Sequence, residues 1–201
     1  MPFFSNAGPG GFEPKRKFRF LVSFTGIQNI EFMATKVNKP SYDMTPKEHQ
    51  VLNHVFKFPG IVKWSDVQVS FVDAVDPNIG SRFYNALLNA GYIQPTRFNN
   101  TATGITKVQA KSALGDVVIK QLNGGGVDVP AGVDTGTFLG NILDTSYVEQ
   151  WTLKNAFIKG VKFGDLDYSS EDLVGIDIDV VYDYAEYVDY GPGGETLQDL
   201  G

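Results

Sequence analysis

Alternation of apolar and polar side chains along residues 173–184 constrains the fold of this chain more than any other feature. Successive side chains of a β-strand point to opposite faces, so the pattern buries one face and leaves the other acidic. The segment therefore predicts a half-buried strand. The apolar face takes Ile176, Ile178, Val180, Tyr182 and Tyr184, and the other face takes Asp177, Asp179, Val181 and Asp183.

A second strand-like run, residues 151–163, lies before this one, and the polar corner 164–172 separates the two. Two such runs around a turn-rich stretch are typical of a β-hairpin. We expect residues 151–184 to form a long hairpin around which the rest of the chain is organised.

Further strands and one helix are predicted elsewhere. Asp76-Pro77 predicts a helix start, because Asp caps helices well and Pro suits the first helical position. Apolar residues then recur at helical spacing until Gly91, which can end the helix in the left-handed conformation. Strand patterns cover residues 17–24, 30–37, 49–58, 64–73, 106–110 and 116–122. The fold class is therefore mainly β, an antiparallel barrel or sandwich with one flanking α-helix.

The 201 residues suffice for one β domain with its own core, which we place at residues 15–185, with a long loop within 94–147. Residues 1–14 are expected to be a flexible arm and residues 186–201 an acidic tail. The chain has no cysteine, which excludes disulfides and a cysteine nucleophile. No apolar run approaches the roughly 20 residues of a membrane span, and no signal peptide pattern is present.

Charge is distributed unevenly along the chain. All 17 Lys and Arg lie at or before Lys162 together with 12 acids, whereas the last 39 residues hold 11 acids and no base. Opposite charges at two ends of a molecule suit packing of identical subunits, because unlike patches attract. A solubilising tail is the alternative for residues 186–201.

The sequence favours neither a catalytic site nor a metal site. Asp177 and Asp179 share a strand face about 6.6 Å apart, but no cleft or basic partner is indicated. The corner 164–172 lacks calcium-loop spacing, which favours a turn held by Asp and Ser side chains. His49 and His54 would point to opposite faces of one strand, so a shared metal is disfavoured and His54 is expected in a core or interface. We expect no enzymatic activity, no metal and no cofactor.

Several ordered sequence phrases resemble the tail tube proteins of long-tailed bacteriophages, particularly contractile, T4-like phages. The phrases are Val51-Leu52-Asn53-His54, Lys57-Phe58-Pro59-Gly60, Trp64-Ser65-Asp66-Val67, Phe71-Val72-Asp73, Trp151-Thr152-Leu153-Lys154-Asn155-Ala156, Phe163-Gly164-Asp165-Leu166-Asp167-Tyr168-Ser169-Ser170 and Tyr182-Asp183-Tyr184-Ala185.

The resemblance implies a tail-tube or haemolysin-coregulated-protein-like fold, homohexameric rings, and stacking of rings into a virion tube that conducts DNA during ejection. It also implies tail sheath and baseplate or terminator partners, assembly in the host cytoplasm, and no membrane contact. Asp177, Asp179 and Asp183 would line the lumen, where they would repel DNA phosphates. Alternatives are a baseplate tube initiator or secretion-tube protein of the same fold, or a monomeric β-sandwich that binds a ligand.

The N-terminal region offers candidate inter-subunit contacts. Its aromatic residues suggest a docking arm, although a disordered end fits the composition equally, and its basic cluster can guard a strand edge or contact a neighbour. The candidates are Phe3, Phe4, Phe12, Lys15, Arg16, Lys17 and Arg19.

Overall fold

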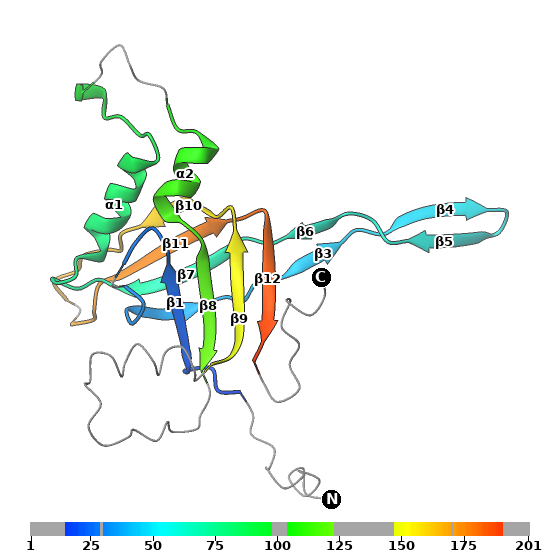
Figure 1. Ribbon diagram of the computed structural model, residues 1–201, viewed down its shortest axis with the longest axis horizontal. Helices are drawn as coiled ribbons and strands as arrows, with labels where there is room; N and C mark the ends of the chain where they lie inside the picture. Colours follow the sequence, from blue (N-terminus) through cyan, green and yellow to red (C-terminus); the bar gives the residue numbers. More distant parts are fainter. Residues whose placement is uncertain (1–14, 29, 98–103, 123–146, 170, 191–201) are drawn as a thin grey trace, which may run out of the picture.

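The computed structural model describes residues 15–28, 30–97, 104–122, 147–169 and 171–190, and Figure 1 shows their arrangement. The strands in these residues are β1 (Phe20–Phe24), β2 (Ala34–Val37), β3 (Tyr42–Met44), β4 (Lys47–Val51), β5 (His54–Phe58), β6 (Val62–Trp64), β7 (Val67–Val72), β8 (Val117–Leu122), β9 (Tyr147–Lys154), β10 (Phe157–Lys162), β11 (Gly175–Val181) and β12 (Tyr184–Asp189). The helices are α1 (Ile79–Asn89), the short 3-10 helix η1 (Pro95–Arg97) and α2 (Lys107–Leu114).

Two four-stranded antiparallel sheets share one hydrophobic core. Sheet A has the order β1-β8-β9-β12 and sheet B the order β10-β11-β7-β2. In Figure 1 the upright strands of sheet A cross those of sheet B. Each fully buried aliphatic or aromatic side chain contributes about 1.5–3 kcal/mol to folding. The core includes Val22 and Phe24 of β1, Val69 and Phe71 of β7, Ile119 of β8, Leu153 of β9, and Ile176, Ile178 and Val180 of β11.

The long C-terminal hairpin connects the two sheets. In sheet A, β9 pairs with β12, and Lys154 lies opposite Tyr184. In sheet B, β10 pairs with β11, and Phe157 lies opposite Val181. The register is the same on both sides of the bend, and the Asp183 amide donates to the Lys154 carbonyl at 3.1 Å between the two ladders. One hairpin thus bends between the sheets and supplies strands to both.

Asn155 and Asp183 form the bend. Asn155 has a φ of 57°, a left-handed conformation that Asn tolerates better than most residues. Its amide Nδ2 donates to Asp183 Oδ2 at 2.9 Å, and Lys107 Nζ of α2 lies 2.7 Å from both Asp183 oxygens. The hydrogen bonds from Lys107 and Asn155 lower the pKa of the Asp183 carboxyl.

The predicted hairpin is confirmed, with two corrections. Its bend places Tyr184 in sheet A, where the side chain is exposed instead of continuing the buried face of β11. Its last strand runs to Asp189, so residues 186–189 belong to β12 rather than to an acidic tail.

A second hairpin, residues 34–72, projects from sheet B. Its base is the β2–β7 pair, and the ladder continues outward through β3–β6 and then β4–β5. The Asn38 amide donates to the Gln68 carbonyl at 3.1 Å and the Ser65 amide to the Ser41 carbonyl at 2.9 Å, so the ribbon is continuous at its root. We call residues 42–64 the arm; it extends to the right in Figure 1, away from both sheets.

The prediction of a single strand over residues 49–58 is wrong, because a two-residue turn divides it. Leu52 there takes a φ of 52°, and Val51 lies directly opposite His54. His49, two residues before Val51, therefore shares a face with His54, contrary to the prediction. His54 is exposed within this chain.

The predicted helix after Pro77 is confirmed, but it begins later than expected. The Asp76–Pro77 peptide bond is cis, and Asn78 is the N-cap, accepting from the Ser81 amide at 2.6 Å. Gly91 follows the helix with a φ of 104°, as expected. The buried stripe of α1 consists of Ile79, Phe83 and Ala86.

A second helix replaces the strand predicted at residues 106–110. Thr106 caps α2 by accepting from the Gln109 amide at 3.3 Å, and Gly115 ends it with a φ of 73°. The predicted strand at residues 116–122 is confirmed as β8. The single flanking helix of the sequence prediction is thus corrected to two α-helices in the described residues.

The bend gives the first testable prediction. Asn155→Ala should lower the free energy of unfolding by about 1–2 kcal/mol, because Ala is strained at positive φ. Asn155→Gly removes the same hydrogen bond to Asp183 without that strain, so it should cost less. Urea unfolding of both variants measures the difference. Equal losses would show that the side-chain bond, and not the backbone, holds the bend.

Candidate assembly surfaces

The arm is amphipathic at both its root and its tip. Strand alternation and register place Tyr42, Met44, Val62 and Trp64 on one face of the root, opposite Asp43 and Lys63. At the tip, one face carries Lys47, His49, Val51, His54, Phe56 and Phe58, and the other carries Glu48, Gln50, Val55 and Lys57.

Within the described residues, the arm is attached to the core through its root. The Trp64 ring lies 5.4 Å from the Tyr42 ring and 6.0 Å from the Tyr182 ring. At the tip, Phe56 and Phe58 keep 53% and 55% of their surface exposed. An isolated two-stranded ribbon is marginally stable in water, and contiguous exposed apolar surface marks interaction sites. The arm therefore has the chemistry of a docking element.

A basic pocket lies at the end of the sandwich where the described chain begins. Its volume is about 520 Å³. We use this name for the hollow lined by six cationic residues, by one carboxylate and by apolar side chains of both sheets. The cationic residues are Lys15, Arg16, Lys17, Lys36, Lys39 and Lys120, the carboxylate is Glu149, and the apolar residues include Phe20, Val37, Ile119 and Trp151.

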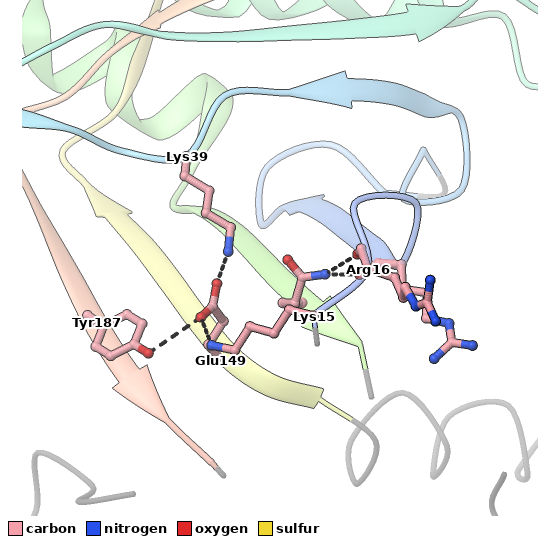
Figure 2. A network of polar contacts seen from close by, with 7 residues as sticks. Lys15, Arg16, Lys39, Glu149 and Tyr187 are labelled. Atoms are coloured by element: carbon pink, nitrogen blue, oxygen red, sulfur yellow. Dashed lines mark hydrogen bonds and ion pairs between the residues drawn. The ribbon is translucent and has the colours of Figure 1, made fainter. Parts of the chain in front are cut away.

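Glu149 is the buried anion of this pocket. Its side chain points inward from β9, and Lys15 and Lys39 both donate to its carboxylate (Figure 2). The Tyr187 hydroxyl approaches Glu149 Oε2 at 3.5 Å, and the Tyr187 ring packs 4.7 Å from that of Trp151. Glu149 thus ties the first described residues and the segment after β2 to sheet A.

Burial raises the pKa of the Glu149 carboxyl, but the hydrogen bonds from Lys15 and Lys39 outweigh it and hold the pKa below its usual value. The same hydrogen bond from Lys15 to Glu149 raises the pKa of the Lys15 ammonium. Both groups are therefore charged at neutral pH, as a paired buried ion should be.

Gln121 is the second polar residue at this end, and it lies directly opposite Glu149 in the β8–β9 ladder. Its Nε2 donates to the carbonyl oxygens of Arg16 and Arg19 at 2.7 and 2.8 Å. Inward-facing polar residues at this end of the sandwich thereby fix the path of residues 15–19.

The predicted inter-subunit residues fall into two groups. Lys15, Arg16 and Lys17 line the basic pocket. Arg19 instead lies over the Phe18 ring, with its guanidinium carbon 5.3 Å from the ring centre. Phe3, Phe4 and Phe12 lie outside the described residues.

The structure brings only two of the three predicted lumen residues together. Asp177 and Asp179 project from the outer face of β11, and Asp177 accepts from Ser70 Oγ at 2.5 Å. Lys162 lies opposite Asp177 in the β10–β11 ladder, so the face is less acidic than the β11 sequence alone indicates. Asp183 is at the bend, paired with Lys107.

The corner between β10 and β11 is acidic and exposed. We call residues 163–174, apart from residue 170, which lies outside the described residues, the acidic corner. As predicted, an Asp and a Ser hold its turn: Asp167 Oδ1 accepts from the Ser169 amide at 2.9 Å and from the Ser169 hydroxyl at 2.8 Å. These two hydrogen bonds lower the pKa of the Asp167 carboxyl.

Among the described residues, no group of three or more His, Cys, Asp and Glu side chains could hold a metal ion. None of the described helices is long and apolar enough to span a membrane.

Solved structures of contractile injection systems contain chains with this fold. A chain of the 6-fold symmetrised anti-feeding prophage (AFP) baseplate has a TM-score of 0.57 at 16% identity, covering 90% of this chain and 99% of that chain. A chain of the PVC sheath/tube terminator of an extracellular contractile injection system has a TM-score of 0.56 at 16% identity, over 88% and 97%. A chain of the AFP tube terminating cap has a TM-score of 0.57 at 16% identity, over 94% and 99%.

No protein-family model matches the sequence, and the comparison with curated proteins gives no match. At 16% identity the structural likeness concerns the fold. The predicted mainly β, tail-tube-like fold is confirmed, and the neighbours come from contractile injection systems rather than specifically from T4-like phages.

Sequence reasoning missed Glu149 and Gln121. Both interrupt apolar alternation on the inward faces of their strands, and that interruption is the signal that could have identified them. The partners Lys15 and Lys39 are more than 100 residues away from Glu149 in the chain, so no local pattern indicates the pairing.

Glu149 generates a prediction for acid stability. Because its folded-state pKa is lowered, its stabilising contribution is complete above the unfolded pKa of about 4.3 and is lost as the pH falls through the folded pKa. Glu149→Gln should lower the free energy of unfolding at pH 7 by about 1–2 kcal/mol and weaken its decline below pH 4.5. Glu48→Gln, which alters an exposed pair with Lys57, is the control. Unfolding midpoints from pH 3 to 7 test this, and identical acid limbs for wild type and Glu149→Gln would contradict it.

Proposed function

We propose that this chain is a structural tube subunit, in which identical copies form hexameric rings that stack into a tail tube conducting DNA. The observation that supports this proposal most directly is the amphipathic arm. A ribbon with aromatic residues on one face and no core of its own gains stability when another chain covers that face.

The structural neighbours support this assignment. The printed descriptions of those structures name a 6-fold symmetrised baseplate, a sheath/tube terminator, a sheath–tube complex and a tube terminating cap. A role as the tube of a contractile bacteriophage tail, with sheath and terminator proteins as partners, is the specific form of the proposal. This role is structural and requires no catalytic group.

In this proposal the edges of the two sheets pair with edges of neighbouring copies. Strands β12 and β1 bound sheet A, and β10 and β2 bound sheet B. Unpaired strand edges favour association, and closure into a ring removes them. Hexameric closure would therefore satisfy the backbone groups at these edges that have no strand partner among the described residues.

The arm provides the test. Phe56→Asp/Phe58→Asp should fold normally, because both side chains are exposed in the single chain, but should weaken self-association roughly tenfold or more. Gln50→Asp, which changes the opposite face of the same ribbon, is the matched control. Circular dichroism checks folding and sedimentation velocity measures association. Undiminished association of the double variant would contradict the role of the arm.

Asp177 and Asp179 form the proposed lumen surface, with Asp183 contributing less because Lys107 neutralises it. Carboxylates facing DNA keep it from binding, whereas lysines would bind it with strong salt dependence. Assembled tubes of Asp177→Lys/Asp179→Lys should therefore retain labelled DNA at about 50 mM salt and release it at about 200 mM. Wild-type tubes and tubes of Glu31→Lys/Asp76→Lys are the controls in a co-sedimentation assay. Absence of DNA retention by the β11 double variant would place that face away from the lumen.

A further inference from the structure

Contacts within the single chain neutralise only part of the positive charge of the basic pocket. Lys15 and Lys39 are engaged by Glu149, but Arg16, Lys17 and Lys36 form no ion pair within the described residues. Three unpaired cations around one hollow repel one another, and an anionic partner would remove that repulsion.

The lining of the pocket is not only cationic. Phe20 of β1, Val37 of β2 and Trp151 of β9 also line it, and each remains partly accessible. A matching ligand therefore has an apolar centre flanked by carboxylates. Free inorganic anions would satisfy the cations alone and leave the apolar wall in water.

The acidic corner has this chemistry. Asp165 and Glu171 are exposed and form no ion pair within the described residues. Between them, Leu166 keeps 87% of its surface exposed and Tyr168 is completely exposed. An apolar pair between carboxylates is complementary to an apolar wall among cations.

We propose that the basic pocket of one copy receives the acidic corner of a second copy. This inference rests on the self-association proposed above and names one contact in it. The residues that line the basic pocket and those that form the acidic corner are separate sets, so the corner does not occupy the pocket of its own chain. The contact we propose is therefore between copies.

The contact would be head-to-tail, because two different surfaces meet. Contacts of this kind build rings when the rotation closes and extended stacks when it does not. The charge asymmetry between the first 162 residues and the last 39 is then the sequence signature of a polar assembly.

A charge swap tests the proposal. Arg16→Glu/Lys36→Glu reverses the pocket, and Asp165→Lys/Glu171→Lys reverses the corner; none of the four side chains has an ion pair within the described residues. Each double variant should associate about tenfold more weakly than wild type, and the quadruple variant should regain most of that loss. Sedimentation velocity at fixed ionic strength gives the association constants. Lys111→Glu, which reverses an exposed lysine outside the pocket, the corner and the arm, is the control for a change of net charge.

A second variant addresses the apolar part of the contact. Tyr168→Ala should also weaken association by about tenfold, since a buried aromatic anchor is lost, while leaving every charge in place. Its circular dichroism spectrum should match that of wild type, because the side chain is exposed in the single chain.

The possible outcomes separate this contact from the broader function. A wild-type protein that never self-associates contradicts both proposals. If the pocket-reversed variant associates as strongly as wild type, this contact is contradicted, and the proposal of a tube subunit is not. Loss of association on pocket reversal without recovery in the quadruple variant means that the acidic corner is not the occupant.

Discussion

The bend of the C-terminal hairpin is the constraint on which the rest of the structure depends. One pair of strands runs from Glu149–Asp189 to Lys162–Asp177 with one shift of register between Ile158 and Gly160, and the left-handed backbone of Asn155 turns it from sheet A into sheet B. Because both sheets contain part of this hairpin, their inner faces are held against one core. The Asp183 carboxylate at the bend also holds α2 through Lys107. Asp183 therefore has a structural role at the bend, which does not depend on the proposed lumen.

The two ends of the bent hairpin carry opposite chemistry. At one end, Glu149 gathers Lys15 and Lys39 and leaves a cationic hollow around itself. At the other end, the acidic corner carries exposed carboxylates and exposed apolar side chains. A third surface, the arm, extends from the base formed by β2 and β7. The proposed self-association uses these three surfaces.

Alternation was enough to predict the hairpin, β1, β7 and β8, because each alternates between a buried and a solvated face. Alternation does not predict the division of residues 49–58, because β4 and β5 are not half-buried: they carry apolar residues without a core. The turn at Leu52 also has no Gly to indicate it. Helix α2 was missed although Thr106 and Gln109 have capping-box spacing. The basic pocket could not be predicted, since its residues come from residues 15–20, residues 35–39, β8 and β9, which meet through long-range pairing.

Negative-stain electron microscopy of the untagged protein, with mass photometry on the same sample, tests the central claim most directly. The account predicts hollow rings or stacked tubes of uniform diameter, and masses at multiples of 22.1 kDa that reach a hexamer. Six copies closed around a central channel would establish the tube subunit and direct attention to the residues that line the channel. A protein that stays monomeric over a wide concentration range, with or without a baseplate-type initiator, would contradict the account.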